Sequence, residues 1–179
     1  EVAPERLSEI IQVASQEFDF IVLDVASGIE GQIKSVSTSS DRNSISRWAV
    51  ANANQVIVVA GADPVGIARH LDAMSAISEL HPKGEVITLV NRLRTSVLGL
   101  SAKQQITQTL AGLGQLQVAG FVPDDPAAAD AALKASLPIA LSKRSSQARM
   151  AVALFTKTKI LGERTALDRR LFRPMAKLG

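Results

Sequence analysis

Short apolar runs alternate with segments of helical spacing along most of the chain. Apolar residues recur at helical spacing over residues 7–14, and Pro4 stands where such a helix begins. The run at 18–24 predicts a buried strand, and the polar, serine-rich stretch at 31–46 predicts a loop. A short helix is expected at 45–53.

Three further apolar runs predict strands at residues 55–61, 85–91 and 116–122. Helices are predicted at 63–80 and 101–113, between these strands. After the last strand come an alanine-rich helix at 126–133, an extended link at 137–139 and an amphipathic helix at 145–161. Strands that alternate with helices predict an α/β fold with a mainly parallel sheet flanked by helices.

The composition fits this fold and excludes several kinds of site. Because only 3% of residues are aromatic, the core must consist of Ala, Val, Ile and Leu, which suits parallel strands buried on both faces. The absence of cysteine excludes disulfides and thiolate chemistry. His70 and His81 lack the companions of a zinc site and are expected on helix surfaces. The chain begins with Glu1 and has no signal peptide pattern, which favours a fragment or a processed product.

Charge is distributed unevenly along the chain. Residues 143–179 hold 10 of the 20 Lys and Arg but only 2 of the 17 Asp and Glu. From residue 164, apolar and basic side chains fall on opposite sides of a helical projection, the pattern of an interfacial membrane helix, although Pro174 interrupts it. An anionic membrane is therefore one candidate partner of residues 164–179. Non-specific DNA binding is a weaker candidate, and a solvated basic tail is the plain alternative.

A carboxylate and a glycine follow the first predicted strand. Asp24 ends the run at 18–24, and Gly28 lies four residues further on. Ligands of open α/β sheets bind at the carboxyl ends of strands, where a glycine lets the backbone approach a phosphate and move when it leaves. An aspartate that only caps the next segment explains Asp24 equally well. The phosphate-binding motif G-x-x-x-x-G-K-[ST] does not occur in the 179 residues.

Polar residues also follow two later strands. Asn91 ends the strand at 85–91 and offers a donor and an acceptor to a purine edge, although a bond to its own backbone is the commoner role. Pro123 and Asp124 follow the last strand, where a proline-fixed turn can form the wall of a base pocket. A simple strand-to-helix turn with Asp125 at the helix N-terminus is the alternative. Three polar strand ends at one sheet edge predict a single site.

The order and spacing of these segments resemble the MinD/ParA/CpaE-like group of P-loop ATPases over about residues 5–160. D-V-A-S-G-I-E at 24–30 is similar to the family's D-S-P-A-G-I-E, A-G-A-D-P at 60–64 to its post-strand turn, and V-N-R at 90–92 to its adenine-contacting segment. F-V-P-D-D-P at 121–126 resembles its P-x-D segment, and R-S-S-Q-A-R at 144–149 resembles a pattern of CpaE-like members. Together these motifs indicate the superfamily rather than one member.

The resemblance implies a role for each candidate residue. Asp24 would hold the shell of a Mg²⁺ ion through water, and Gly28 would be the switch glycine; these are the implied catalytic positions. The implied adenine-binding positions lie at the two later strand ends and are Asn91, Arg92, Pro123 and Asp124. ATP and Mg²⁺ are the cofactors that the resemblance implies for the intact protein.

The same resemblance implies a domain organisation and a biological role. Residues 1–162 would be the C-terminal part of a P-loop ATPase-like domain, and 163–179 a basic amphipathic tail. The intact protein would be a cytoplasmic ATPase that dimerises on ATP and positions the septum, a pilus or secretion apparatus, or DNA. Residues 164–179 could hold it at the inner face of the membrane.

Two departures from the family pattern leave alternatives open. Ala26 stands where the family's switch segment has proline, and the family's phosphate loop lies upstream of the helix that opens this chain. Without that loop the 179 residues would not hydrolyse ATP alone. A pseudo-ATPase scaffold is the alternative function, and a nucleotide-free interaction module would leave the polar strand ends unexplained. The strand at 18–24 would also lack a neighbour, which predicts instability or self-association.

Overall fold

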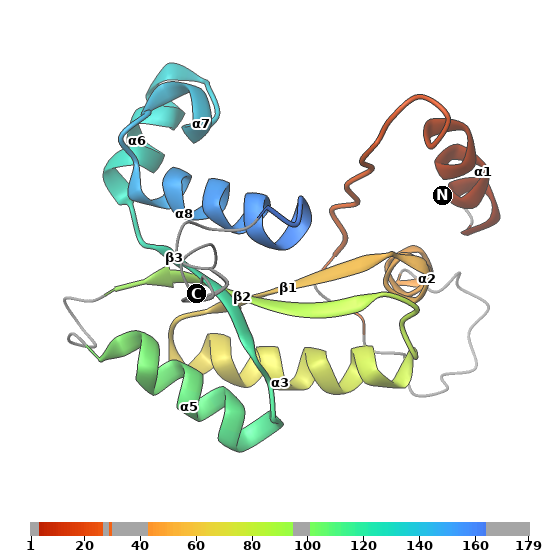
Figure 1. Cartoon of the computed structure of the whole chain (residues 1–179), viewed down its shortest axis with the longest axis horizontal. Helices are drawn as coiled ribbons and strands as arrows, with labels where there is room; N and C mark the ends of the chain where they lie inside the picture. The colour runs from red at the N-terminus through yellow and green to blue at the C-terminus, as the bar shows by residue number, and fades with distance from the viewer. Residues whose placement is uncertain (1–3, 27–28, 30–42, 95–100, 164–179) are drawn as a thin grey trace, which may run out of the picture. The chain divides into compact units, whose positions relative to one another are not determined.

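The computed structural model describes residues 4–26, 29, 43–94 and 101–163, whose contacts form two compact units, Glu1–Thr88 and Leu89–Gly179 (Figure 1). The elements of the first unit are α1 (Pro4–Ala14), α2 (Ser44–Asn52), β1 (Gln55–Gly61) and α3 (Pro64–Glu79). The strand β2 (Glu85–Leu93) crosses the boundary between the units. The second unit continues with α5 (Ala102–Gly114), β3 (Val118–Pro123), α6 (Pro126–Ala135), α7 (Ile139–Ser142), α8 (Gln147–Phe155) and a π-helical turn η1 (Thr156–Ile160).

The strands form a parallel sheet in the order β1-β2-β3. The helix α3 connects β1 to β2, and α5 connects β2 to β3, so each crossover is helical (Figure 1). The predicted α/β fold with a parallel sheet flanked by helices is confirmed. Most predicted element ends lie within two residues of the observed ones, because Pro64 and Pro126 mark helix starts directly in the sequence.

The core of the first unit is formed by residues of α2, β1, α3 and β2 together with Ile29. Ile29, Val50 and Ile77 are buried, and Val56, Val58, Met74, Leu80 and Val86 pack against them. The opposite face of β1 is less covered, because Ile57 and Val59 remain 41% and 57% exposed. Burial of β1 on both faces was expected from its continuous apolar run and is not found among the described residues.

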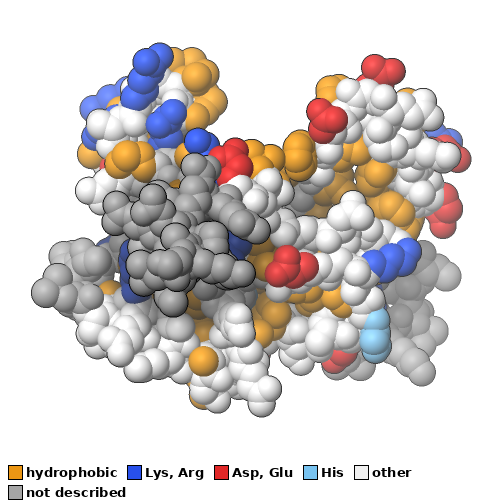
Figure 2. Space-filling model, in the orientation of Figure 1, with side chains coloured by type: hydrophobic (Ala, Val, Ile, Leu, Met, Phe, Trp, Pro, Cys, Tyr) orange, Lys and Arg blue, Asp and Glu red, His pale blue; other side chains and the backbone are white. Residues whose placement is uncertain are grey.

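The strand predicted at residues 18–24 is absent from the sheet. The segment is extended but makes no strand ladder, and its alternate residues Phe18, Phe20 and Val22 are 65%, 60% and 90% exposed. Figure 2 shows hydrophobic side chains at the surface around α1 and the segment that follows it (orange, upper right). The apolar pattern identified a strand-forming segment, but a strand also needs a neighbour to accept and donate its backbone hydrogen bonds.

The core of the second unit is formed on both faces of β3. Gly120 faces α8, because a Cβ atom built there would lie 2.9 Å from Phe155 Cδ2. The next residue, Phe121, faces α5, where Lys103 Nζ lies 5.8 Å from the ring centroid. Side chains alternate across a strand, so α8 and α5 cover opposite faces of β3 (Figure 1).

The last helices differ in detail from the prediction. The extended link ends at Pro138, and α7 forms a single turn where Ile139 was expected to be extended. The helix predicted at 145–161 is observed as α8 followed by η1. Residues 164–179, the candidate membrane-binding tail, lie outside the described residues, so the boundary between 1–162 and 163–179 stays a prediction. Among the helices described, none has the length and apolar character needed to cross a membrane.

Candidate functional site

Two strand ends that were predicted to bind a base are joined in the second unit. The backbone N–H of Asp124, directly after β3, donates to the carbonyl of Leu93 at the end of β2 over 3.0 Å. Arg94 Nε lies 2.9 Å from Asp124 Oδ2, with the two side chains 55% and 27% exposed. The turn after β3 is therefore tied to the end of β2 by a backbone hydrogen bond and an ion pair.

The residues at the end of β2 adopt an uncommon conformation. Asn91 Oδ1 accepts a 2.8 Å hydrogen bond from the backbone N–H of Arg92, which is the local backbone role considered for Asn91. Arg92 itself has φ of 60°, in the left-handed region that residues other than glycine rarely adopt. Such strained residues occur disproportionately at functional sites. The carboxamide N–H donors of Asn91 are the groups suited to a base acceptor.

Asp125 connects the start of two helices. Its Oδ1 accepts from the backbone N–H of Ala128 over 3.1 Å and caps α6, as its position in the sequence suggested. Its Oδ2 accepts from Ser146 Oγ over 2.7 Å and from the N–H of Gln147 over 3.1 Å. The hydrogen bond from Ser146 lowers the pKa of Asp125, and the backbone hydrogen bond from Ala128 and the positive charge of Lys143 lower it further.

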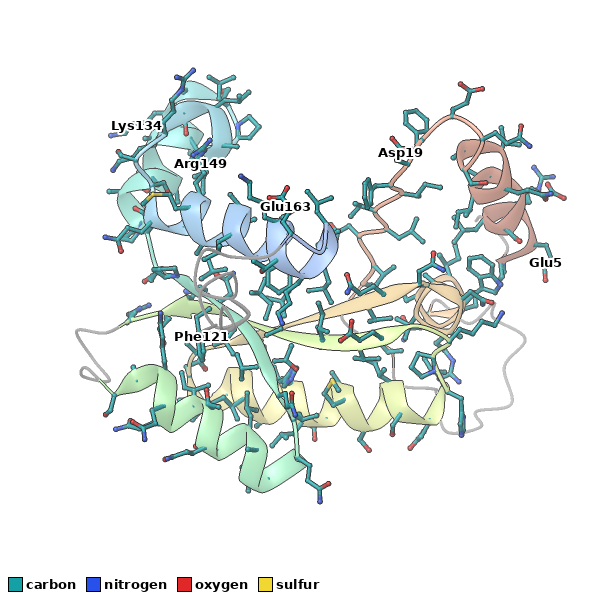
Figure 3. All side chains as sticks on the ribbon, in the orientation of Figure 1. Glu5, Asp19, Phe121, Lys134, Arg149 and Glu163 are labelled. Carbon is teal, nitrogen blue, oxygen red and sulfur yellow. The ribbon has the colours of Figure 1, made fainter. Side chains whose placement is uncertain are left out.

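The start of α8 is held by further hydrogen bonds. Ser146 is 1% exposed, and its Oγ accepts from the N–H of Arg149 over 3.1 Å, which caps the helix. The guanidinium of Arg149 donates to the carbonyls of Ala140 and Arg144 over 3.2 and 3.3 Å. Figure 3 shows Arg149 on α8 beside α7. The connection from α7 to α8 is therefore fixed at several points.

A polar cavity lies at this junction. It has a volume of about 430 Å³ and is lined by Asp124, Asp125, Lys143, Ser145 and Gln147. It is partly open to solvent, and of the residues predicted to bind a base it is lined by Asp124 alone. The lining offers acceptors from two carboxylates and donors from lysine, serine and glutamine, which suits a polar ligand rather than an apolar one.

The implied metal-binding position lies in the first unit. Asp24 is exposed at the end of the extended segment, and Gly28 lies outside the described residues. Among the described residues, no three His, Cys, Asp or Glu side chains gather as a metal site. A single carboxylate fits the implied role, because Mg²⁺ prefers oxygen ligands and commonly keeps several waters.

The expectation that His70 lies on a helix surface is wrong. His70 is 2% exposed on α3, and its Nε2 lies 3.1 Å from Thr88 Oγ1 on β2. Its Nδ1 is buried and has no hydrogen-bond partner among the described residues. Burial lowers the pKa of His70 because it disfavours the charged imidazolium. His81 is exposed, as expected, but it lies just after the end of α3 with φ of 49° rather than on a helix.

Sequence reasoning missed the residues that connect distant segments. Ser146 and Gln147 lie within a recognised motif, and Arg94 and Lys143 lie close to one, but none of the four had an assigned role. Ser146, directly before the apolar helix at 147–155, is an N-cap signal that the sequence does contain. The contact of Ser146 with Asp125 spans 21 residues of sequence, which no local pattern reveals.

Comparison with known proteins agrees with the architecture. The chain is 29% identical over 171 residues to the septum site-determining protein MinD of Bacillus subtilis, covering 93% of this chain and 56% of that protein. It is 25% identical over 121 residues to MinD of Synechocystis, covering 68% of this chain and 40% of that protein. No family model matches the chain. The chain spans about half the length of the curated relatives it matches.

Solved structures share the fold at lower sequence identity. The MinD cell division protein of Aquifex aeolicus aligns with a TM-score of 0.66 and 19% identity, covering 90% of this chain and 60% of that chain. A ParA family ATPase from Chlorobium tepidum aligns with a TM-score of 0.69 and 16% identity, covering 87% and 57%. A chain of the MinC:MinD cell division protein complex of Aquifex aeolicus aligns with a TM-score of 0.68 and 18% identity, covering 92% of this chain and 61% of that chain.

Proposed function

Because the chain is related to the MinD/ParA-like P-loop ATPase superfamily, we propose that it is the C-terminal portion of an ATP-binding and ATP-hydrolysing positioning ATPase. Its residues supply the adenine-binding side of the nucleotide site and one carboxylate for the Mg²⁺ shell. The phosphate-binding loop is not among these 179 residues, so this proposal concerns the natural polypeptide that carries them.

The observation that carries the proposal is the joined pair of strand ends. Asn91 and Arg92 at the end of β2 are tied to the turn of Pro123 and Asp124 through the 3.0 Å hydrogen bond between Asp124 and Leu93. A polar cavity adjoins Asp124. In this proposal the carboxamide of Asn91 bonds the adenine edge, Arg92 flanks the base, and Pro123 and Asp124 form the pocket wall.

The phosphate side of the proposal rests on the sequence. Asp24 would orient water in the shell of Mg²⁺, and Gly28 would let the backbone follow the γ-phosphate. When bound, Mg²⁺ would neutralise charge on the β- and γ-phosphates during transfer. The exposed carboxylate of Asp24 is available for this role.

The cellular part of the proposal follows the relatives. A MinD structure has been solved as a complex with MinC, which supports a protein partner for this chain too. We extend the proposal to dimerisation on ATP, to a cytoplasmic location, and to peripheral attachment to an anionic membrane through residues 164–179. Positioning of the septum, of a pilus or secretion apparatus, or partitioning of DNA are the candidate tasks.

A pseudo-ATPase scaffold is the second candidate function. It is favoured by Ala26, which replaces the proline of the family's switch segment, and by the backbone bond that occupies Asn91 Oδ1. The scaffold keeps the fold and the nucleotide pocket but does not turn over ATP.

Phosphate release from ATP by the natural polypeptide and its Asp24→Ala variant separates the two functions. The enzyme predicts hydrolysis in the wild type and its loss in D24A, with ATP binding retained. Glu17→Ala, which removes an exposed carboxylate outside the proposed site, is the matched control and should hydrolyse like the wild type. Binding without hydrolysis in the wild type indicates the scaffold. Unchanged hydrolysis in D24A would overturn the role of Asp24.

A further inference from the structure

The turn that carries the proposed pocket wall is held from two sides. On one side, Asp124 is bound to Leu93 and Arg94 at the end of β2. On the other side, Asp125 is bound to Ser146 and Gln147 at the start of α8. Two neighbouring carboxylates thus connect one short turn to a strand and to a helix that lie far from it in sequence.

Ser146 is central to the second connection. Its hydroxyl donates to Asp125 Oδ2 over 2.7 Å and accepts from the N–H of Arg149 over 3.1 Å, so both of its hydrogen-bonding roles are used. The side chain is 1% exposed, and hydrogen bonds in such sites depend on partner geometry more than those open to water. The 2.7 Å distance is typical of a charge-assisted bond to a carboxylate.

The far end of α8 is anchored to the same strand that leads into the turn. Phe155 is buried against Gly120 of β3, where a Cβ atom would come within 2.9 Å of the ring. The helix therefore packs on β3 at one end and binds the turn after β3 at the other. Because both anchors belong to one rigid element, α8 fixes where the turn lies.

The cavity lies between the two connected segments. Asp124 and Asp125 line it from the turn, and Lys143, Ser145 and Gln147 line it from the segment that leads into α8. The hydrogen bonds from Ser146 and Gln147 to Asp125 directly link these two walls. Asp124 is bound to β2 independently of them, so these bonds act on the distance between the turn and the start of α8.

We propose that Asp125 and Ser146 are positioning residues of the base pocket, which set the distance between the turn of Pro123 and Asp124 and the start of α8. This inference rests on the proposed function and assigns a role to two residues beyond it. Neither residue needs to touch the nucleotide. Their effect is on the shape of the pocket and therefore on the choice between bases.

The test compares ATP and GTP affinities of the natural polypeptide by competition against a fluorescent ATP analogue. Ser146→Ala removes the hydroxyl, and we expect a loss of about tenfold in ATP affinity, with a smaller change for GTP, since hydrogen bonds to charged groups contribute on this scale. Ser146→Thr keeps the hydroxyl and should retain the wild-type preference within about twofold. Thr109→Ala, which removes an exposed hydroxyl bonded to Gln105 O on α5, is the matched control.

Asp125→Asn provides a second, independent variant. Asparagine still caps α6, because it can accept from Ala128, but its amide nitrogen cannot accept from Ser146 and Gln147. We expect D125N to reduce the preference for ATP as S146A does, so a folding failure of S146A does not leave the inference without a test. If folded S146A and D125N keep the wild-type preference, the inference is overturned. If the wild type does not bind ATP, the proposed function fails instead, and the inference fails with it.

Discussion

Replacing Gly66 by alanine should destabilise the protein, although the same change elsewhere in a helix stabilises it. Gly66 lies in the first turn of α3, and a Cβ atom there would come 2.6 Å from Gly61 Cα and 2.8 Å from Gly61 O. Carbon contacts are normally about 3.5–4.0 Å, so the overlap is close to 1 Å and involves backbone that cannot rotate away. Overpacking of this kind costs up to about 3 kcal/mol. The gain in helix propensity offsets about 1 kcal/mol, which leaves a net loss of about 2 kcal/mol.

Gly112 of α5 is the matched control for this prediction. A Cβ atom there meets nothing within 4 Å, so Gly112→Ala should raise the free energy of unfolding by about 0.5–1 kcal/mol. Urea denaturation followed by far-ultraviolet circular dichroism measures both variants against the wild type. If G66A were as stabilising as G112A, the close approach of α3 to the end of β1 would be refuted.

Two further predictions concern stability and association. Burial lowers the pKa of His70, so below about pH 6.5, the ordinary histidine value, the unfolded chain binds a proton at this residue that the folded chain does not. The free energy of unfolding should therefore fall as the pH is lowered below about 6.5. The free energy of unfolding, measured between pH 7.5 and 5, should fall equally steeply in the wild type and in His81→Asn, which replaces an exposed histidine. It should fall less steeply in His70→Gln. Equal dependence on pH in H70Q and the wild type would exclude His70 as the cause. Residues 1–179 alone should self-associate through the unpaired segment at 18–24, as measured by size-exclusion chromatography with light scattering. Val22→Lys, at a position 90% exposed on this segment, should reduce the association more than Val65→Lys, at a position 59% exposed on α3. A cooperative, monomeric thermal melt of residues 1–179 would contradict it.

Local patterns predicted most of the fold, because each signal acts within a few residues. Continuous apolar runs identified β1, β2 and β3, and prolines at 64 and 126 identified helix starts. The run at 18–24 gave the same signal but forms no strand, because pairing depends on a neighbour that a local pattern does not reveal. His70 was misjudged for a related reason: its burial depends on how α3 faces Thr88 of β2.

The sequence predicted which residues lie at the candidate site but not the hydrogen bonds and the ion pair that connect them. Polar strand ends identified Asn91 and Asp124, and the structure joins these strand ends through Leu93. The ion pair with Arg94 and the bonds from Ser146 to Asp125 link segments 30 and 21 residues apart. Such long-range pairs depend on the tertiary fold, so they can be identified only when the positions of the strands and helices are known.

Photolabelling with an azido-adenine analogue of ATP identifies the residues that lie against the base. The natural polypeptide that carries residues 1–179 would be labelled, digested and analysed by mass spectrometry, with excess ATP as competitor. We expect competable label on the peptides that hold Asn91–Arg94 or Pro123–Asp124, the two strand ends joined by the Asp124–Leu93 hydrogen bond. Competable label confined to other peptides, or none at all, would contradict binding of the base at these two strand ends.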